Sequence, residues 1–231
     1  MFRYLLLNQG DARSYIIQML LCLPIILLSL SLHETAHGYA AYKLGDSTAH
    51  DMGRLTLNPL KHLDPIGFLC MLFAGFGWAK PVPINTRNFK NPRRDMAICG
   101  AAGPASNLVL AAVFTGLLKI SSEVLLRLNY SSETTATIAY FFLVFLYYGI
   151  QLNITLAVFN LLPVPPLDGS RIFYVFLPPK VYFGVMKYER YISLAIMVLL
   201  MLGVLSPVLN FISSHLINLL FRIFSIHLFG I

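Results

Sequence analysis

The chain contains few charged residues. Asp, Glu, Lys and Arg together make up 12% of its 231 residues, whereas hydrophobic residues make up 57%. An ordinary soluble domain carries about 25% charged residues. This composition therefore excludes a soluble globular protein and predicts a protein that crosses a membrane several times.

Cysteine is also scarce, and the cysteines that are present are far apart. Cys22, Cys70 and Cys99 lie in apolar surroundings without CxxC spacing. This pattern argues against a disulfide framework and against a cysteine zinc knuckle. The net charge of +7 comes from Lys and Arg in the loops between apolar runs. Such a distribution is typical of membrane orientation, so we expect no nucleic-acid partner.

The apolar runs predict a polytopic α-helical membrane protein with about five full transmembrane helices. The expected spans cover residues 14–44, 95–119, 137–161, 191–205 and 208–229. A spanning helix needs about 20 predominantly apolar residues. The apolar run within residues 64–77 is shorter, which predicts a re-entrant or interfacial helix.

Two stretches of the first large loop predict a small membrane-associated β-sheet. Residues 53–58 alternate between polar and apolar, and residues 78–85 are extended and proline-rich. Pro81 and Pro83 cannot donate to a ladder, so the second strand would lie at a sheet edge. The alternative is a plain extended loop.

The basic residues predict the orientation. Lys and Arg accumulate on the cytoplasmic side of membrane proteins. They are dense between the first two full spans and again after residue 168, but sparse in the loop that contains Lys119 and Arg127. The N-terminus should therefore face outward and the far end of the first helix should face the cytoplasm. Arg3 and Arg13 argue weakly against this orientation.

A His-Glu-x-x-His motif lies at the end of the first apolar run. At 3.6 residues per turn, His33 and His37 share one helix face and can reach one metal ion, with Glu34 beside them as a general base. The alternative is a chance match with buried core histidines. Ionisable residues are rare within transmembrane segments and usually functional there, which favours the metal site.

A third ligand is expected where the helix of residues 137–161 ends. Pro163, Pro165 and Pro166 stop that helix and leave the following chain extended. Asp168 then lies on the same side of the membrane as His33 and His37. Two histidines and one carboxylate with an open fourth position form a catalytic zinc arrangement. The alternative role for Asp168 is to cap the next helix.

These motifs together resemble the site-2 protease family of intramembrane zinc metalloproteases (peptidase family M50). The resemblance covers roughly residues 31–172 and shows no motif departure. It rests on HExxH and on the runs Gly53 to Pro59, Gly77 to Pro83, Gly103 to Asn107 and Asn160 to Gly169. The match is closest to compact family members without a PDZ or CBS domain.

The resemblance implies a role for each site residue. It implies that His33, His37 and Asp168 bind Zn²⁺, and that Glu34 is the general base. It also implies that Asn160 stabilises the oxyanion and that Asn107 faces the substrate. We expect further substrate contacts at positions on the neighbouring helix and on the extended segment: Gly103, Val82 and Ile84.

Several of these residues also have purely structural readings. Gly100, Gly103 and Ala105 could form a small-residue face for helix packing. A structural hydrogen bond would satisfy either Asn107 or Asn160. The remaining histidines are not expected to be ligands: we expect solvated loop positions for His50 and His62, and interfacial positions for His215 and His227.

The sequence therefore predicts one intramembrane metalloprotease domain, with a catalytic core at about residues 14–176 and C-terminal helices at about 188–229. Its expected reaction is hydrolysis of peptide bonds in or near transmembrane segments, in regulated intramembrane proteolysis. The expected partners are Zn²⁺, the lipid bilayer, transmembrane protein substrates and a regulatory membrane protein. The expected location is a bacterial or archaeal plasma membrane. The alternative is a non-proteolytic metal carrier or scaffold, in which Glu34 has no obvious purpose.

Overall fold

The computed structural model describes residues 12–74, 77–127, 132–178, 181, 184–185 and 187–226, and this part of the chain is helical. Its α-helices are α2 (Ala12–Lys43), α3 (Thr48–Asp51), α4 (Pro65–Ala74), α5 (Pro92–Leu126), α6 (Glu133–Asn160), α7 (Asp168–Phe173), α9 (Glu189–Met201) and α10 (Ser206–Ile223). Short 3₁₀ turns are η1 (Pro59–Lys61), η2 (Thr86–Asn88) and η3 (Tyr174–Phe176).

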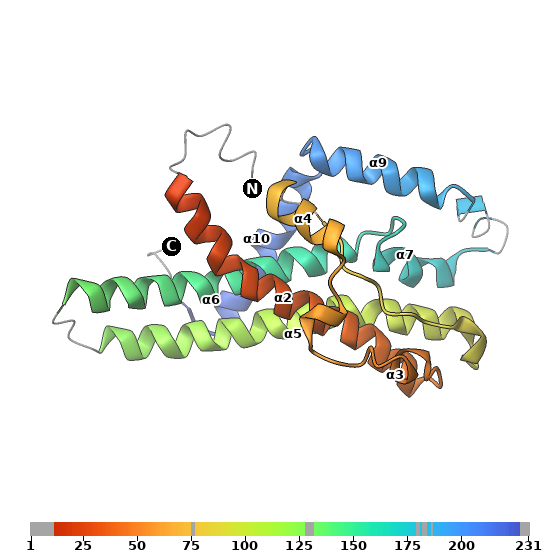
Figure 1. Cartoon of the computed structure of the whole chain (residues 1–231), viewed down its shortest axis with the longest axis horizontal. Helices are drawn as coiled ribbons and strands as arrows, with labels where there is room; N and C mark the ends of the chain where they lie inside the picture. The colour runs from red at the N-terminus through yellow and green to blue at the C-terminus, as the bar shows by residue number, and fades with distance from the viewer. Residues whose placement is uncertain are drawn as a thin grey trace.

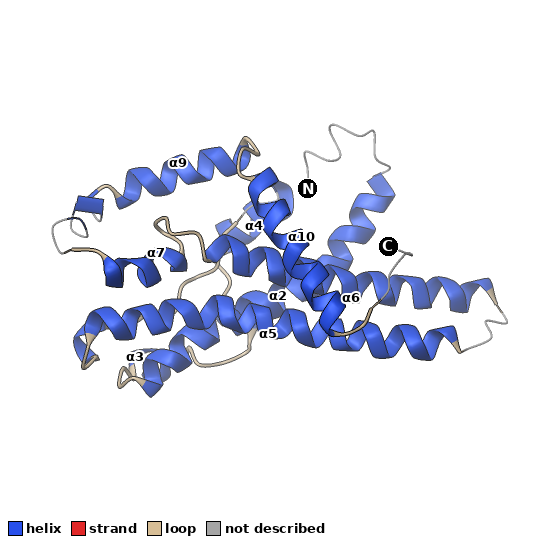
Figure 2. Cartoon of the chain, turned by 180° about the vertical axis from the view of Figure 1, so that it is seen from behind, coloured by secondary structure: helices blue, strands red, loops and turns tan. Residues whose placement is uncertain are grey.

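Three long helices form the body of the protein. Helices α5 and α6 run antiparallel side by side, and α2 crosses them obliquely (Figure 1). Seen from behind, α10 crosses over α6 (Figure 2). Local sequence explains two of the helix starts. Pro92 occupies the first turn of α5, where no amide hydrogen is needed, and the Ser132 hydroxyl caps α6 by accepting a hydrogen bond from the Thr135 amide.

The prediction of about five full spans is wrong for the described residues. Three segments are long and apolar enough to cross a membrane: Met19–Lys43, Pro92–Leu125 and Glu133–Asn160. Helix α9 has 13 residues and is therefore about 20 Å long, short of the roughly 30 Å hydrocarbon core. Helix α10 has 18 residues, but Asn, Ser, His and Arg side chains interrupt its apolar run. Helix α4, with 10 residues, is also too short to span.

The predicted β-sheet is also wrong. Over the residues that the structure describes, no strand forms, and one isolated antiparallel bridge joins Leu63 to Ala79. Two amides that a ladder would need donate to side chains instead: the Val82 amide to Glu34 and the Asn85 amide to Asp46. With prolines at 81 and 83 removing further donors, the segment can only run as an extended loop against α2.

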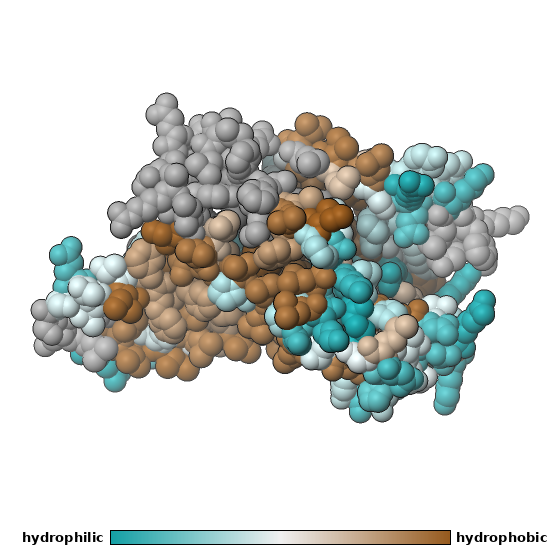
Figure 3. Space-filling model, in the orientation of Figure 1, coloured by the Kyte–Doolittle hydropathy of each residue, from teal (hydrophilic) through white to brown (hydrophobic). Residues whose placement is uncertain are grey.

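The apolar core lies where α2, α5, α6 and α10 meet. It is formed by Ile25, Ala111, Phe114, Leu118, Leu146, Ile150, Ile154, Val158, Leu209 and Ile217. On the face shown in Figure 3, hydrophobic residues form a band over the middle of the long helices, and hydrophilic residues gather toward their ends. A band of this kind is what a lipid-facing surface requires.

Candidate metal centre

Helix α2 places its two histidines side by side near its C-terminal end. His33 and His37 are one turn apart, and the two residues are 6% and 7% exposed. Their rings meet edge to face with an interplanar angle of 86°. The Nε2 atoms therefore point to a common position, 3.0 Å from each other.

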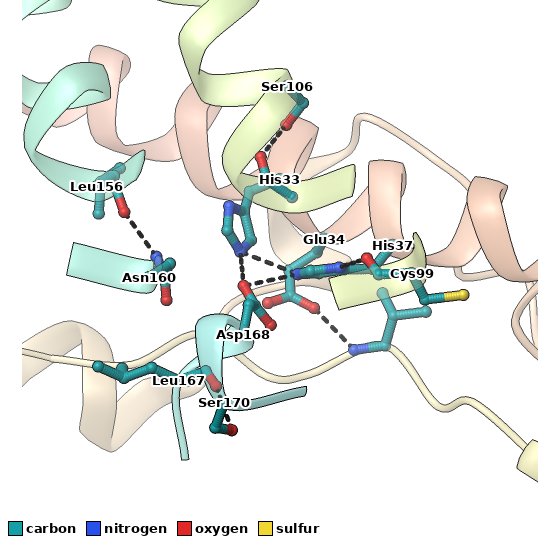
Figure 4. Close-up of polar contacts among 12 residues, drawn as sticks. His33, Glu34, His37, Cys99, Ser106, Leu156, Asn160, Leu167, Asp168 and Ser170 are labelled. Atoms are coloured by element: carbon teal, nitrogen blue, oxygen red, sulfur yellow. Dashed lines mark hydrogen bonds and ion pairs between the residues drawn. The ribbon is translucent and has the colours of Figure 1, made fainter. Parts of the chain in front are cut away.

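The Asp168 carboxylate completes a triangle with the two imidazoles. Its Oδ2 lies 3.1 Å from His33 Nε2 and 3.2 Å from His37 Nε2 (Figure 4). In a tetrahedral zinc site with bonds of about 2.0 to 2.1 Å, ligand atoms are about 3.3 Å apart. The three separations therefore match three corners of such a site. Among the described residues, these three side chains form the group with metal-ligand geometry.

The backbone fixes the tautomer of His37. Its Nδ1 donates a 2.7 Å hydrogen bond to the carbonyl oxygen of Cys99 on α5. Because a carbonyl can only accept, the proton sits on Nδ1 and Nε2 is left with a free lone pair. A hydrogen bond of this kind orients metal-binding histidines in general.

The Asp168 carboxylate is available as a metal ligand because it does not cap helix α7, which begins at this residue. Helix α7 starts at Asp168, its N-cap is Leu167, and no side chain caps it. The capping alternative is therefore wrong. Burial raises the pKa of Asp168, but the adjacent imidazoles of His33 and His37 outweigh burial and hold that pKa well below its usual range. The group is an anion at neutral pH, as a ligand must be.

Two glycines allow these groups to meet. A Cβ on Gly103 of α5 would lie 2.4 Å from His37 Nε2 and 2.7 Å from His33 Cε1. A Cβ on Gly169 would lie 2.3 Å from the Leu161 carbonyl oxygen at the end of α6. Any side chain at either position would displace the histidines or Asp168, so both glycines are needed for close approach.

Glu34 lies beside this centre, as expected from its position next to His33. Its Oε2 accepts a 2.8 Å hydrogen bond from the amide of Val82. Val82 is buried and Ile84 is half-buried. The extended segment that carries both residues therefore lies against the catalytic face of α2.

The two asparagines occupy different surroundings. Asn160 is half-buried in the last turn of α6, and its Nδ2 donates to the Leu156 carbonyl oxygen at 3.0 Å. Asn107 is fully buried, one turn beyond Gly103, and neither atom of its amide group has a hydrogen-bond partner. Their assigned roles toward a substrate remain predictions.

Some residues at the site differ from the sequence expectation or were not predicted. His62 is 1% exposed and its Nε2 donates to the Thr56 carbonyl, so the solvated position expected for it is wrong. The sequence also gave no sign that the Cys99 carbonyl or the Arg54 side chain would matter. The first acts through its backbone, and the second through contacts 26 residues away.

Fold and site together define a class: a helical membrane protein with two histidines and one carboxylate arranged as metal ligands beside a glutamate. The chain belongs to peptidase family M50, which matches residues 21–205. This confirms the resemblance to the site-2 protease family, and with it that the protein is a metallopeptidase.

Individual relatives carry consistent names. The chain is similar to "Putative zinc metalloprotease YwhC" of Bacillus subtilis, with 44% identity over 203 residues, which is 86% of this chain and 90% of the relative. It is also similar to "Putative zinc metalloprotease Rip2" of Mycolicibacterium smegmatis, with 31% identity over 202 residues (85% and 71%). A protein of the same name from Mycobacterium tuberculosis is 31% identical over 190 residues (80% and 66%). No solved structure matches the chain.

Proposed function

We propose that this protein is a zinc endopeptidase that hydrolyses peptide bonds in or near the transmembrane segments of membrane proteins. The observation that carries the proposal is the meeting of His33 Nε2, His37 Nε2 and Asp168 Oδ2 within 3.0 to 3.2 Å, with Glu34 beside them. This centre is built at the end of an apolar helix that is long enough to cross a membrane. The names of the relatives support zinc as the metal.

The residues divide the chemistry as follows. His33, His37 and Asp168 would hold the zinc ion, which when bound polarises a carbonyl and makes water more acidic. Glu34 accepts the proton of the attacking water and passes it to the departing amine. Asn160 donates to the developing oxyanion after its amide turns away from the Leu156 carbonyl.

A transmembrane substrate must unwind before it can be cut. In a helix the peptide carbonyls accept intrahelical hydrogen bonds and are shielded from attack. We assign the contacts to this unwound segment to the side chains of Val82 and Ile84, and to the α5 face that carries Gly103 and Asn107. Val82 already donates its amide hydrogen to Glu34, and Pro81 and Pro83 have none, so the contacts assigned here use side chains. Residues that weaken a helix near the cut would lower the free energy of unwinding.

The basic loops support an active site that faces the cytoplasm of a prokaryotic plasma membrane. The exposed basic residues Arg87, Lys90, Arg93 and Arg94 lie at the end of the loop that precedes α5 and in the first turn of α5, and such residues gather on the cytoplasmic side of membrane proteins. A metal carrier would need further metal-binding groups along its path. Within the described residues, the metal-ligand geometry is confined to the one group at His33, His37 and Asp168.

A substrate-trapping experiment tests the proposal. The Glu34→Gln variant keeps the zinc ligands but lacks the base, so it should hold uncut substrates when expressed in a prokaryotic host. Mass spectrometry of the proteins retained by this variant, but not by the wild type, should identify membrane proteins whose fragments appear only with the active enzyme. Retention without any corresponding cleavage by the wild type would contradict the proposal.

A further inference from the structure

One peptide group, between Pro81 and Val82, is held from both sides. The Val82 amide donates to Glu34 Oε2 at 2.8 Å. On the other side, Arg54 Nη2 donates to the carbonyl oxygens of Lys80 at 2.9 Å and Pro81 at 3.2 Å. The peptide group therefore links a half-buried cation to the carboxylate beside the metal centre.

The sequence around this peptide group provides a single backbone hydrogen-bond donor, the amide of Val82. Neither Pro81 nor Pro83 has an amide hydrogen, so Val82 supplies the sole backbone donor of these three residues. Val82 is 8% exposed. A buried amide hydrogen without an acceptor is strongly unfavourable. The Glu34 carboxylate supplies the acceptor that the Val82 amide needs.

We propose that the Val82 amide and Arg54 position the Glu34 carboxylate for catalysis. The inference rests on the proposed role of Glu34 as general base. A glutamate side chain has three rotatable bonds, and holding Oε2 fixes its orientation and leaves Oε1 to receive the proton. Arg54 fixes the peptide group that does the holding. A base must lie within hydrogen-bond reach of the proton it takes, and small displacements can reduce the rate by about 100-fold.

This role differs from the substrate contact assigned to the Val82 side chain. Positioning uses the main-chain N–H and should change kcat. A substrate contact uses the side chain and should change KM. The two roles therefore separate when the amide hydrogen is removed and the valine side chain is kept.

Hydrogen exchange measures the bond without relying on activity. Between Pro81 and Pro83, Val82 carries the one exchangeable amide, so a short peptide across it reports on this hydrogen in mass spectrometry. In Glu34→Ala and in Arg54→Ala, exchange at Val82 should accelerate at least about tenfold. Glu123→Ala, which removes an exposed glutamate of α5, is the control and should leave the rate unchanged. Equal exchange in the wild type, Glu34→Ala and Arg54→Ala would overturn the proposal.

Replacing the Val82 amide by an ester tests the catalytic consequence. Incorporation of α-hydroxyvaline at position 82 replaces the N–H by an ester oxygen and keeps the valine side chain. It also makes the Pro81 carbonyl a weaker acceptor for Arg54, so it weakens both of the bonds that hold this peptide group. The same replacement at the exposed Val208, in the first turn of α10, is the matched control because first-turn amides have no acceptor within their helix. At position 82, kcat should fall at least about tenfold, with KM within about twofold and zinc content unchanged. An unchanged kcat, or a change in KM alone, would contradict the inference.

Two further comparisons keep the outcome decisive. If the ester variant does not fold, Arg54→Ala should lower kcat at constant KM, and Arg54→Lys, which can still donate one hydrogen bond to the Pro81 carbonyl, should recover part of it. No difference among wild type, Arg54→Ala and Arg54→Lys would contradict the inference. Activity in Glu34→Gln would contradict the proposed function itself. An inactive Glu34→Gln together with a fully active ester variant would contradict only the positioning role of the Val82 amide and Arg54.

Discussion

His37 Nδ1 donates a 2.7 Å hydrogen bond to the carbonyl oxygen of Cys99, which lies 62 residues later on α5. The bond joins the helix that carries both histidines to the helix that packs against them. It fixes the imidazole ring and leaves Nε2 free to bind a metal. Since the acceptor is a main-chain atom, the chemistry does not depend on the Cys99 side chain.

The metal centre predicts one zinc ion per chain. Elemental analysis of the purified protein should find zinc in the wild type and in Glu34→Gln, and should find it lost in His33→Ala, His37→Ala and Asp168→Ala. Each of the last three variants removes one of three protein ligands. Glu34→Gln should lose about 10²- to 10⁴-fold in kcat, the usual contribution of a general base. Zinc retained in all three alanine variants would mean that the ion binds elsewhere.

Gly103→Ala should weaken metal binding although it removes no ligand. Its Cβ would lie 2.4 Å from His37 Nε2, so the histidine must move. Because displacement of orienting groups around a metal typically reduces affinity by about 10- to 100-fold, the zinc dissociation constant should rise by at least that amount. A competition titration with a chromogenic chelator measures it.

Gly116→Ala provides the matched control for Gly103→Ala. It adds the same methyl group to the same helix, at a position where the new Cβ meets the edge of the Phe224 ring at 3.3 Å. Its zinc affinity should equal that of the wild type. Equal affinity in Gly103→Ala would show that the histidines have more room than the contact distances indicate.

The sequence predicted which three side chains meet, but not the architecture around them. His33, His37 and Asp168 could be predicted because a helical repeat of four residues and a proline stop are local signals. The number of spans could not, because α9 and α10 end where polar residues and the Gly203 turn interrupt the apolar runs. Likewise, whether residues 78–85 pair as a strand depends on where their amides find acceptors. Those acceptors, Glu34 and Asp46, are supplied by distant parts of the chain.

Asp46 should stabilise the loops around the centre. It is fully buried beyond the end of α2, and its carboxylate accepts hydrogen bonds from the amides of Thr48 and Asn85 and from the side chains of Thr48 and Asn88. Asp46→Asn replaces one acceptor oxygen by a donor that faces donors. We expect the free energy of unfolding to fall by about 1 to 3 kcal/mol. Asp51→Asn, at an exposed position, is the control and should change little.

The contribution of Asp46 should also depend on pH. Burial raises the pKa of Asp46, but the hydrogen bonds from Thr48, Asn85 and Asn88 outweigh burial and lower that pKa below its usual value. The stabilisation is therefore complete above about pH 4, the unfolded pKa, and is lost as the pH falls through the folded pKa. Thermal unfolding in detergent should show the wild type and Asp46→Asn converging as the pH is lowered from 6 to 3. A gap that stays constant over this range would contradict the assignment.

The orientation of the protein predicts where a substrate is cut. If the loops rich in Lys and Arg face the cytoplasm, the centre at the end of α2 acts in the cytoplasmic leaflet. Sequencing the new termini of a single-pass substrate should place the cut in the half of its span nearest the cytoplasm. Cuts near the outer interface would reverse the orientation.

Substrates should carry residues that weaken their helix near the cut. A stable transmembrane helix keeps its carbonyls in intrahelical hydrogen bonds, and Gly or Pro lowers the free energy of local unwinding by about 1 to 3 kcal/mol each. Replacing such residues by Leu in a substrate should therefore slow cleavage by about fivefold or more, since each 1.4 kcal/mol is tenfold in rate.

The control is a Leu replacement of an Ala one turn outside the cut region, with membrane insertion of every variant checked by glycosylation or alkylation of engineered sites. Because the Val82 amide already donates to Glu34, it is not free to form a hydrogen bond with an unwound substrate. Equal rates for native and Leu-substituted substrates, both fully inserted, would show that unwinding does not limit cleavage.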